Sequence, residues 1–231
     1  PATDAAVDAT RGLVLLCGNK LAATYYHSTC GGMTDDAGLL WGPEYAAPYL
    51  SGGRDVSTKG DTTPPINELL TVKDAYCQRS SNIRWTLTYT PAQVDTLVGK
   101  NLGKLTGDPD VKIAKVTNMT IEERTPNGRV WHLRVEGDGA SVVVDGDKIR
   151  WLFGTGDPGP AGLPSTLFDL KISRDAAGQP TGYVFTGAGR GHGIGLCQWG
   201  ADGRAKAGQT CRQILKAYFP GTRLSDEKVA K

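Results

Sequence analysis

The chain has 231 residues, of which 39% are hydrophobic and 22% are charged, as in an ordinary globular protein with a hydrophobic core. Its 26 Lys and Arg residues nearly balance its 24 Asp and Glu residues, for a formal net charge of +2. This balance argues against nucleic-acid binding, which depends on a dominant cationic surface. The sequence contains no apolar run of about 18 residues, the length that a transmembrane helix needs, and no signal-peptide pattern.

The first half of the chain predicts short elements separated by turns. Residues 4–12 favour a helix, and residues 12–32 are typical of a β-hairpin with a Gly-Asn-Lys turn. Residues 35–68 lack a clear periodicity and predict a long loop, and a segment of this kind is usually either functional or disordered. Residues 84–90 alternate as a strand does, and Thr90-Pro91 then begins a helix.

The second half of the chain predicts more strands than helices. Residues 111–144 are the clearest β region, with three alternating runs. The other predicted elements are a helix at 145–154, strands at 165–173 and 183–189, and helices at 199–209 and 210–219. We therefore expect a single strand-rich α+β domain over residues 1–224, with a β-rich subregion at about 108–145, and a polar tail at 225–231.

The stretch at residues 187–200, GAGRGHGIGLCQWG, places reactive and aromatic side chains among closely spaced glycines. Glycine lacks a Cβ atom, so the backbone of this stretch can approach other groups closely or adopt positive φ. Trp199 beside Gln198 suggests a sugar-binding platform, in which the indole stacks on a pyranose ring and the amide bonds its hydroxyl groups. A core Trp at the start of a helix explains the same pattern equally well.

Two short motifs each hold an imidazole and a thiol on glycine-rich backbone, namely His27-x-x-Cys30 and His192-x4-Cys197. If the two loops meet, their two nitrogens and two sulfurs form a tetrahedral ligand set that is common for zinc. The alternatives are a disulfide between Cys30 and Cys197, or buried unpaired thiols. The chain has five cysteines, an odd number, so they cannot all pair within it.

The sequence does not clearly contain a pair of carboxylates suited to glycosidic chemistry. Glu122-Glu123 lies within a predicted strand and is interpreted as surface. Glu44 lies in an aromatic setting close in sequence to the first His/Cys motif, and we consider it as a candidate catalytic acid. A hydrolase that uses Cys30 or Cys197 as its nucleophile is a further alternative, although no nucleophile-elbow spacing supports it.

Four segments resemble the SpoIID/LytB domain family, and they occur in the same order. They are YYHSTCGGMT at 25–34, the segment from Trp41 to Leu50, LPSTLFDL at 163–170, and GRGHGIGLCQWGADGRAKAGQTCRQILKAYFPGT at 189–222. The last motif is long and specific, and the resemblance covers nearly the whole chain. It implies a SpoIID-type domain with a glycine-lined cleft.

The resemblance also implies an activity. Family members with known activity are lytic transglycosylases, which cleave peptidoglycan between N-acetylmuramic acid and N-acetylglucosamine and leave a 1,6-anhydro end. A single acid/base carboxyl can suffice, because the sugar's own 6-hydroxyl replaces water. The resemblance therefore implies a bacterial, extracytoplasmic protein that acts on glycan strands of the cell wall. The family also includes an amidase modifier, so a non-catalytic wall-binding or amidase-enhancing module is the alternative.

One part of the family pattern is not found in this sequence. The catalytic Glu of the family lies on a helix with a pattern like EALKAQAVAARTY, upstream of the segment that matches residues 4–12. No such pattern occurs in residues 1–231, so no residue of this sequence inherits that role. We expect the acid to come from a segment before Pro1 or from a separate polypeptide, and we expect that segment or other wall hydrolases to be partners of this chain.

The remaining implications concern the binding residues. By the resemblance, the residues expected to contact the glycan are His27, Ser28, Gly31, Gly32, Thr34, Arg190, His192, Gly193, Gln198 and Trp199. Some family members bind zinc near the cleft through His and Cys residues, which implies that His27, Cys30, His192 and Cys197 are the positions to test. An ion with four protein ligands has no open position, so it would hold two loops together rather than activate water.

Overall fold

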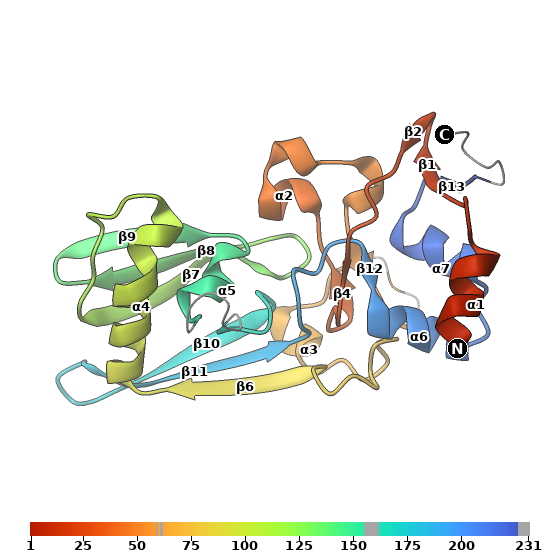
Figure 1. Cartoon of the computed structure of the whole chain (residues 1–231). Coiled ribbons are helices and arrows are strands. Elements are labelled where there is room, and N and C mark those ends of the chain that lie inside the picture. The colour runs from red at the N-terminus through yellow and green to blue at the C-terminus, as the bar shows by residue number, and fades with distance from the viewer. Residues whose placement is uncertain (59, 61, 155–161, 226–231) are drawn as a thin grey trace.

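The computed structural model describes residues 1–58, 60, 62–154 and 162–225. The fold is α+β, as the sequence predicts. Its helices and strands form two groups that lie side by side (Figure 1), and each group encloses a large hydrophobic core. Within the predicted polar tail, residues 226–231 lie outside the described residues. Among the helices of the described residues, none is long and apolar enough to cross a membrane.

Short helices and strands follow one another along the chain. The first part contains α1 (Ala2–Ala9), β1 (Leu15–Cys17), β2 (Lys20–Leu21), β3 (Tyr26–His27), β4 (Met33–Thr34), α2 (Ala37–Trp41), the 3-10 helices η1 (Pro43–Tyr45) and η2 (Pro48–Leu50), β5 (Gly53–Arg54) and α3 (Ile66–Leu69). The second part contains β6 (Arg84–Tyr89), α4 (Pro91–Thr106), β7 (Val116–Arg124), β8 (Val130–Gly137), β9 (Ala140–Asp145), α5 (Lys148–Leu152), β10 (Phe168–Arg174), β11 (Pro180–Ala188), β12 (Leu196–Cys197), α6 (Gln198–Lys206), α7 (Cys211–Tyr218) and β13 (Arg223–Leu224).

The first core lies between α4 and two antiparallel sheets, β7-β8-β9 and β10-β11-β6. Helix α4 starts at a capping box, in which Thr90 accepts a hydrogen bond from the Gln93 backbone and the Gln93 side chain accepts one from the Thr90 backbone. Its buried residues Val94, Val98 and Leu102 recur at every fourth position, so they share the helix face that packs on the sheets. The predicted strands in 111–144 and the predicted helix after Thr90 are therefore confirmed.

The second core contains residues from the two ends of the chain, including Leu15, Leu50, Ile194, Ile214 and Phe219. Strands β1 and β2 form the predicted hairpin, with Leu16 opposite Leu21, and β13 pairs with the other side of β1. The prediction that this hairpin extends to residue 32 is wrong. Strand β3 instead pairs in parallel with β12, with Tyr26 opposite Leu196 and His27 opposite Cys197. The Leu196 backbone donates a hydrogen bond to the Tyr25 carbonyl in this pair.

The segment 35–68, predicted as a loop, contains several short elements among its described residues. Asp36 caps α2 by accepting a hydrogen bond of 3.0 Å from the Leu39 backbone. After two 3-10 turns, β5 pairs with β4, with Met33 opposite Arg54. The short elements escape periodicity-based prediction because each spans five residues or fewer. They hold Trp41 and Tyr49 against the second core.

Candidate functional site

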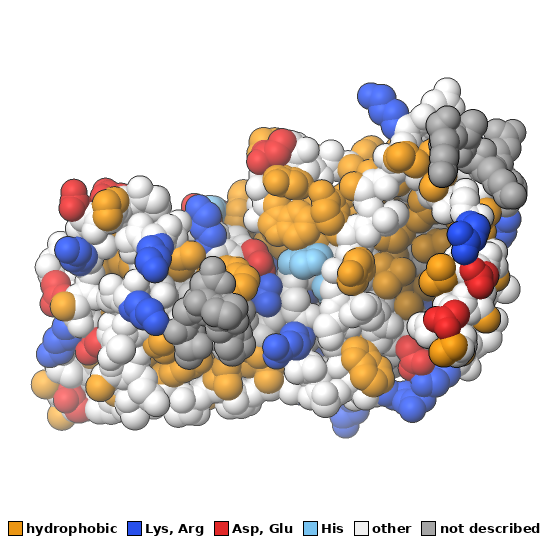
Figure 2. Space-filling view, in the orientation of Figure 1, with side chains coloured by type: hydrophobic (Ala, Val, Ile, Leu, Met, Phe, Trp, Pro, Cys, Tyr) orange, Lys and Arg blue, Asp and Glu red, His pale blue; other side chains and the backbone are white. Residues whose placement is uncertain are grey.

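The two histidines singled out in the sequence lie together. His27 is at the end of β3 and His192 is in the glycine-rich loop before β12, and the parallel pairing of these strands brings the rings to 5.5 Å between centroids. His27 is buried and His192 is half-buried. Figure 2 shows pale blue histidine atoms at the surface of the molecule, next to a patch of hydrophobic side chains. The prediction that the 27–34 and 189–200 loops meet is therefore confirmed.

The hydrogen bonds of each imidazole define its protonation. The His192 Nδ1 atom accepts a hydrogen bond of 3.1 Å from the Ile194 backbone, so the ring proton is on Nε2. The Nε2–H group donates a hydrogen bond of 3.0 Å to the Tyr26 carbonyl. His27 Nδ1 donates to the Ile194 carbonyl at 3.1 Å. Burial lowers the pKa of both histidines, and Arg129 lowers the pKa of His27 further. Both rings are neutral near pH 7.

An aromatic wall adjoins His192. The Trp41 ring at the end of α2 lies 4.8 Å from the His192 ring, and it also contacts Tyr25 at 5.0 Å and Tyr45 at 5.6 Å, all between centroids. Trp41 lines a hollow of about 320 Å³, together with Leu39, Leu40, Gly42, Trp131, Asp145, Gly146, Asp147 and Lys148. Asp147 is ion-paired with Arg150 at 3.0 Å. Its negative charge also raises the pKa of His192, against the larger effect of burial. The hollow thus combines two indoles with charged and hydrogen-bonding groups.

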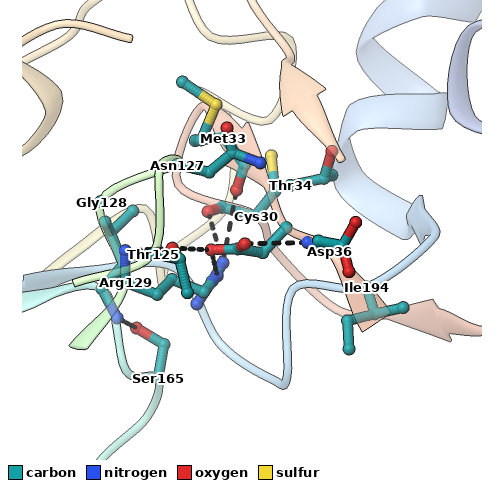
Figure 3. Close-up of polar contacts among 12 residues, drawn as sticks. Cys30, Met33, Thr34, Asp36, Thr125, Asn127, Gly128, Arg129, Ser165 and Ile194 are labelled. Carbon is teal, nitrogen blue, oxygen red and sulfur yellow. Dashed lines mark hydrogen bonds and ion pairs between the residues drawn. The ribbon is translucent and has the colours of Figure 1, made fainter. Parts of the chain in front are cut away.

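A buried arginine that the sequence does not single out forms hydrogen bonds with the loop that follows His27. Arg129 follows the turn between β7 and β8, and its Nη2 atom donates to the carbonyls of Cys30 at 3.2 Å and Met33 at 3.3 Å (Figure 3). Thr125 donates to Asp35 Oδ2 at 2.6 Å in the same network. Burial raises the pKa of Asp35, although Arg129 and Thr125 act to lower it. This network joins the sheet of the first core to the loop that carries His27.

Position 193 in the glycine-rich loop requires a residue without a side chain. Its φ is +82°, and a Cβ atom at this position would collide with the Arg129 guanidinium. The Gly193 carbonyl also accepts a hydrogen bond of 2.9 Å from the Asp35 backbone. The loop therefore lies directly on the buried Arg129–Asp35 network.

The other predicted glycan-contacting residues occupy different surroundings. Gly31 and Gly32 form the turn between β3 and β4, where Thr34 donates to the Gly53 carbonyl at 3.1 Å. The Ser28 carbonyl accepts a hydrogen bond from the Trp199 backbone at 3.1 Å. Arg190, Gln198 and Trp199 are exposed, and Trp199 lies in the first turn of α6. These residues lie on the same two loops as the histidines, but the hollow is lined by Trp41 and Trp131 rather than by Trp199.

Glu44, the candidate acid, is exposed on η1. It directly precedes Tyr45, which contacts Trp41. Glu44 is not among the residues that line the hollow beside Trp41. Its role as an acid stays a prediction.

The four residues predicted as metal ligands do not form one group. Cys30 and Cys197 lie together, with the Cys30 backbone donating to the Cys197 sulfur at 3.2 Å, but their neighbours are Cys77 and Asp55 rather than the histidines. Both His192 nitrogens are already engaged by backbone groups. The ligand set His27, Cys30, His192 and Cys197 therefore does not fit a single tetrahedral ion. All five cysteines are unpaired thiols in this structure, so it contains no Cys30–Cys197 disulfide.

The cysteine cluster favours negative charge on one of its sulfurs. Hydrogen bonds from Cys197 and Cys30, and from the Gly31 and Gly32 backbones, lower the pKa of Cys77 to about 3. Burial raises the pKa of the Cys30 and Cys197 thiols. Cys77 and Asp55 have no spacing signal in the sequence, since Cys77 lies 47 residues from Cys30 and Asp55 lies 25 residues from it.

Comparison with known proteins agrees with the motifs. A family model described as a domain of unknown function, DUF8618, matches residues 42–195. The chain is 28% identical over 221 residues to an uncharacterized protein of Brachyspira hyodysenteriae, and this match covers 96% of the chain and 48% of the relative. Over the same 96% of the chain it is 27% identical to the amidase enhancer and 27% identical to stage II sporulation protein D, both of Bacillus subtilis.

The chain spans half or less of each of these relatives, namely 48%, 32% and 50% of their lengths. The matches nevertheless extend over nearly all of its own length, including both glycine-rich loops. The resemblance inferred from the four motifs is confirmed: the chain belongs to the DUF8618 family and is SpoIID-like.

Proposed function

We propose that this chain is a cell-wall domain that binds peptidoglycan glycan strands along the hollow between Trp41 and Trp131, beside His192. The observation that carries the proposal is the Trp41–His192 contact of 4.8 Å at the edge of a hollow of about 320 Å³. Sugar rings present apolar faces that stack on indoles and hydroxyl groups that need polar partners. This edge of the molecule offers both.

The polar groups of the hollow suit neutral sugars. Asp145 is bonded to His132 at 2.7 Å and Asp147 to Arg150 at 3.0 Å, so each carboxylate is held in place and keeps acceptor capacity for a sugar hydroxyl. Lys148 lines the same hollow and can donate to an acetamido carbonyl or to a peptide-stem carboxylate. Asp147 pairs with the Arg150 cation and Asp145 is bonded to His132, so both acids already have side-chain partners, which favours a binding role over proton transfer.

For the reaction itself, we propose lytic transglycosylation, with the acid supplied from outside residues 1–231. The SpoIID-like motifs support this proposal, and one relative is named stage II sporulation protein D. Neutral His192 and the buried, neutral His27 would then position the glycan rather than act as acids. An extracytoplasmic location follows from this substrate.

The second candidate is a non-catalytic module that binds the wall or enhances an amidase. A relative named amidase enhancer, matched over 96% of the chain, supports this candidate as strongly. The two candidates share the glycan-binding surface and differ only in whether a bond is cleaved.

The binding proposal is tested by co-sedimentation of the purified chain with peptidoglycan sacculi. We expect Trp41→Ala to weaken binding about tenfold or more, since stacked aromatic anchors dominate such interfaces. Trp151→Ala is the matched control, because Trp151 is 46% exposed on α5 and does not line the hollow. Equal binding by wild type and Trp41→Ala would refute the proposed surface.

A muropeptide digest separates the two candidates. Sacculi are incubated with the chain and, in parallel, with the full-length protein, and the products are analysed by mass spectrometry for 1,6-anhydro ends. Anhydro products from the full-length protein alone support transglycosylation with an external acid. Binding without cleavage by either form supports the non-catalytic module, and cleavage by residues 1–231 alone would contradict the external acid and make Glu44 the first residue to replace.

A further inference from the structure

Three thiols and one carboxylate form a buried cluster that the fold builds from four separate segments. The ligand atoms of Cys30, Asp55, Cys77 and Cys197 all lie within 4.8 Å of one another. The three cysteines are 0% exposed and Asp55 is 1% exposed. A buried carboxylate among thiols is costly unless a cation or hydrogen bonds compensate it. Arg204 compensates the Asp55 charge through an ion pair at Oδ1, while Oδ2 lies 3.2 Å from the Cys30 sulfur.

The spacing of the cluster suits a tetrahedral metal ion. Cys30 Sγ lies 3.5 Å from Cys77 Sγ and 3.2 Å from Asp55 Oδ2. Zinc binds thiolates at about 2.3 Å and carboxylate oxygens at about 2.1 Å, so neighbouring tetrahedral ligands are separated by about 3.6–3.8 Å. Shifts of a few tenths of an ångström would open the cluster around an ion.

Backbone donors surround the sulfurs as they do in metal–thiolate sites. The backbones of Cys30 and Gly200 each donate to Cys197 Sγ at 3.2 Å, and that of Gly32 donates to Cys30 Sγ at 3.3 Å. Cys197 is also the N-cap of α6, where the helix dipole favours a negative sulfur. These donors stabilise thiolate rather than thiol.

The carboxylate is oriented by a second set of residues. Asp55 Oδ1 accepts from Arg204 at 2.9 Å, and Asp55 Oδ2 accepts from the Tyr218 hydroxyl at 2.8 Å. A ligating carboxylate is held by outer hydrogen bonds of this kind in metal sites. Gly200 keeps the space clear, because a Cβ atom there would collide with Tyr218 and Asp55. Asp55 is therefore fixed with Oδ2 towards the sulfurs.

We propose that Cys30, Cys77, Cys197 and Asp55 bind one structural zinc ion, in place of the His2Cys2 set that the sequence suggested. Soft thiolates select zinc over calcium or magnesium. Four protein ligands leave no open position, so the ion holds the fold and takes no part in bond cleavage. It ties the loop after β3 and the start of α6 to the segments around Asp55 and Cys77, and so fixes the two loops that carry His27 and His192.

The first test measures metal content and spectra, which do not depend on glycan binding. Zinc at about one equivalent is expected in the purified chain, and cobalt substitution should give the thiolate-to-cobalt absorption of a sulfur-rich tetrahedral site. Cys77→Ser should lose most of the metal. Cys211→Ser is the matched control, because Cys211 is exposed and lies outside the cluster, and it should keep the metal.

The second test uses the unmodified chain, so it holds even if Cys77→Ser does not fold. We expect Cys17 and Cys211 to react with an alkylating reagent in the native protein, and the three cluster thiols to react only after a chelator is added. Protected thiols with stoichiometric zinc support the site. A metal-free protein that takes up no cobalt when reduced, or an intact mass lower by two hydrogens because of a disulfide, would overturn it.

Discussion

Arg129 Nε lies 3.8 Å from Asp35 Oδ2, and both side chains are completely shielded from solvent. This buried ion pair connects the β7–β8 turn of the first core to the loop that follows His27. A buried charge whose partner is removed is left uncompensated in a medium of low dielectric constant. The pair therefore couples the integrity of the candidate site to the contact between the two cores.

We expect Arg129→Met to lower the free energy of unfolding by about 3–5 kcal/mol, because it leaves the Asp35 carboxylate buried and unpaired. The double variant Arg129→Met/Asp35→Asn should lose less than the sum of the two single losses, since it removes both charges. Urea unfolding measures each variant. Lys206→Ala, which breaks the exposed pair with Asp202, serves as a control and should cost less than about 1 kcal/mol.

Two glycines with nearly equal φ angles separate backbone strain from steric collision. Gly193 has φ +82° and Gly178 has φ +78°, but a Cβ atom at Gly193 meets the Arg129 guanidinium whereas one at Gly178 meets nothing within 4 Å. Gly178→Ala should cost about 1–2 kcal/mol for the left-handed conformation alone. Gly193→Ala should cost clearly more, as measured by thermal unfolding. Equal losses would mean that Gly193 does not lie against Arg129.

The buried His27 should make stability fall in mild acid. Its pKa in the folded state is well below the usual 6.5, because burial lowers it and because electrostatic repulsion from Arg129, His192 and Arg150 lowers it further. Below about pH 6.5 the unfolded chain binds a proton that the folded chain refuses, so the free energy of unfolding drops by up to about 1.4 kcal/mol per pH unit for this group.

The pH effect is measured by urea unfolding between pH 7.5 and about pH 5, in wild type and in His27→Gln. The variant keeps an amide that can donate to the Ile194 carbonyl and should show a shallower slope. His192 contributes with the same sign, while Asp35, whose pKa is raised, contributes with the opposite sign above its unfolded value. Identical slopes in the two proteins would contradict a neutral, buried His27.

Much of the fold could be predicted from local patterns. Thr90-Pro91 and the four-residue recurrence from Val94 to Leu102 define α4, and alternation defines the strands between Val116 and Asp145. These elements are long enough for a period to repeat. The parallel β3–β12 pair could not be derived from period, because each strand has two residues. Only the glycine-rich loops that carry His and Cys beside these strands indicate that the two segments meet.

The candidate site could be predicted only in part, for a related reason. His27 and His192 stand out beside glycines, and the structure brings them together. Arg129 follows an ordinary Pro-Asn-Gly turn and Cys77 has no ligand-like spacing, so their roles depend on contacts across 99 and 47 residues. A single sequence contains no local signal for such contacts, and the histidines that spacing suggests as metal ligands bond backbone groups instead.

The most direct test of where the glycan binds is NMR of the five Trp indole groups during titration with peptide-free glycan strands. We predict saturable shifts of the Trp41 and Trp131 indole signals, together with the His192 ring signals. The Trp85 indole does not line the hollow, and it donates a hydrogen bond of 3.0 Å to the Gly189 carbonyl. Its signal should not change. Shifts confined to Trp199, or no shifts at saturating glycan, would contradict the proposed binding surface.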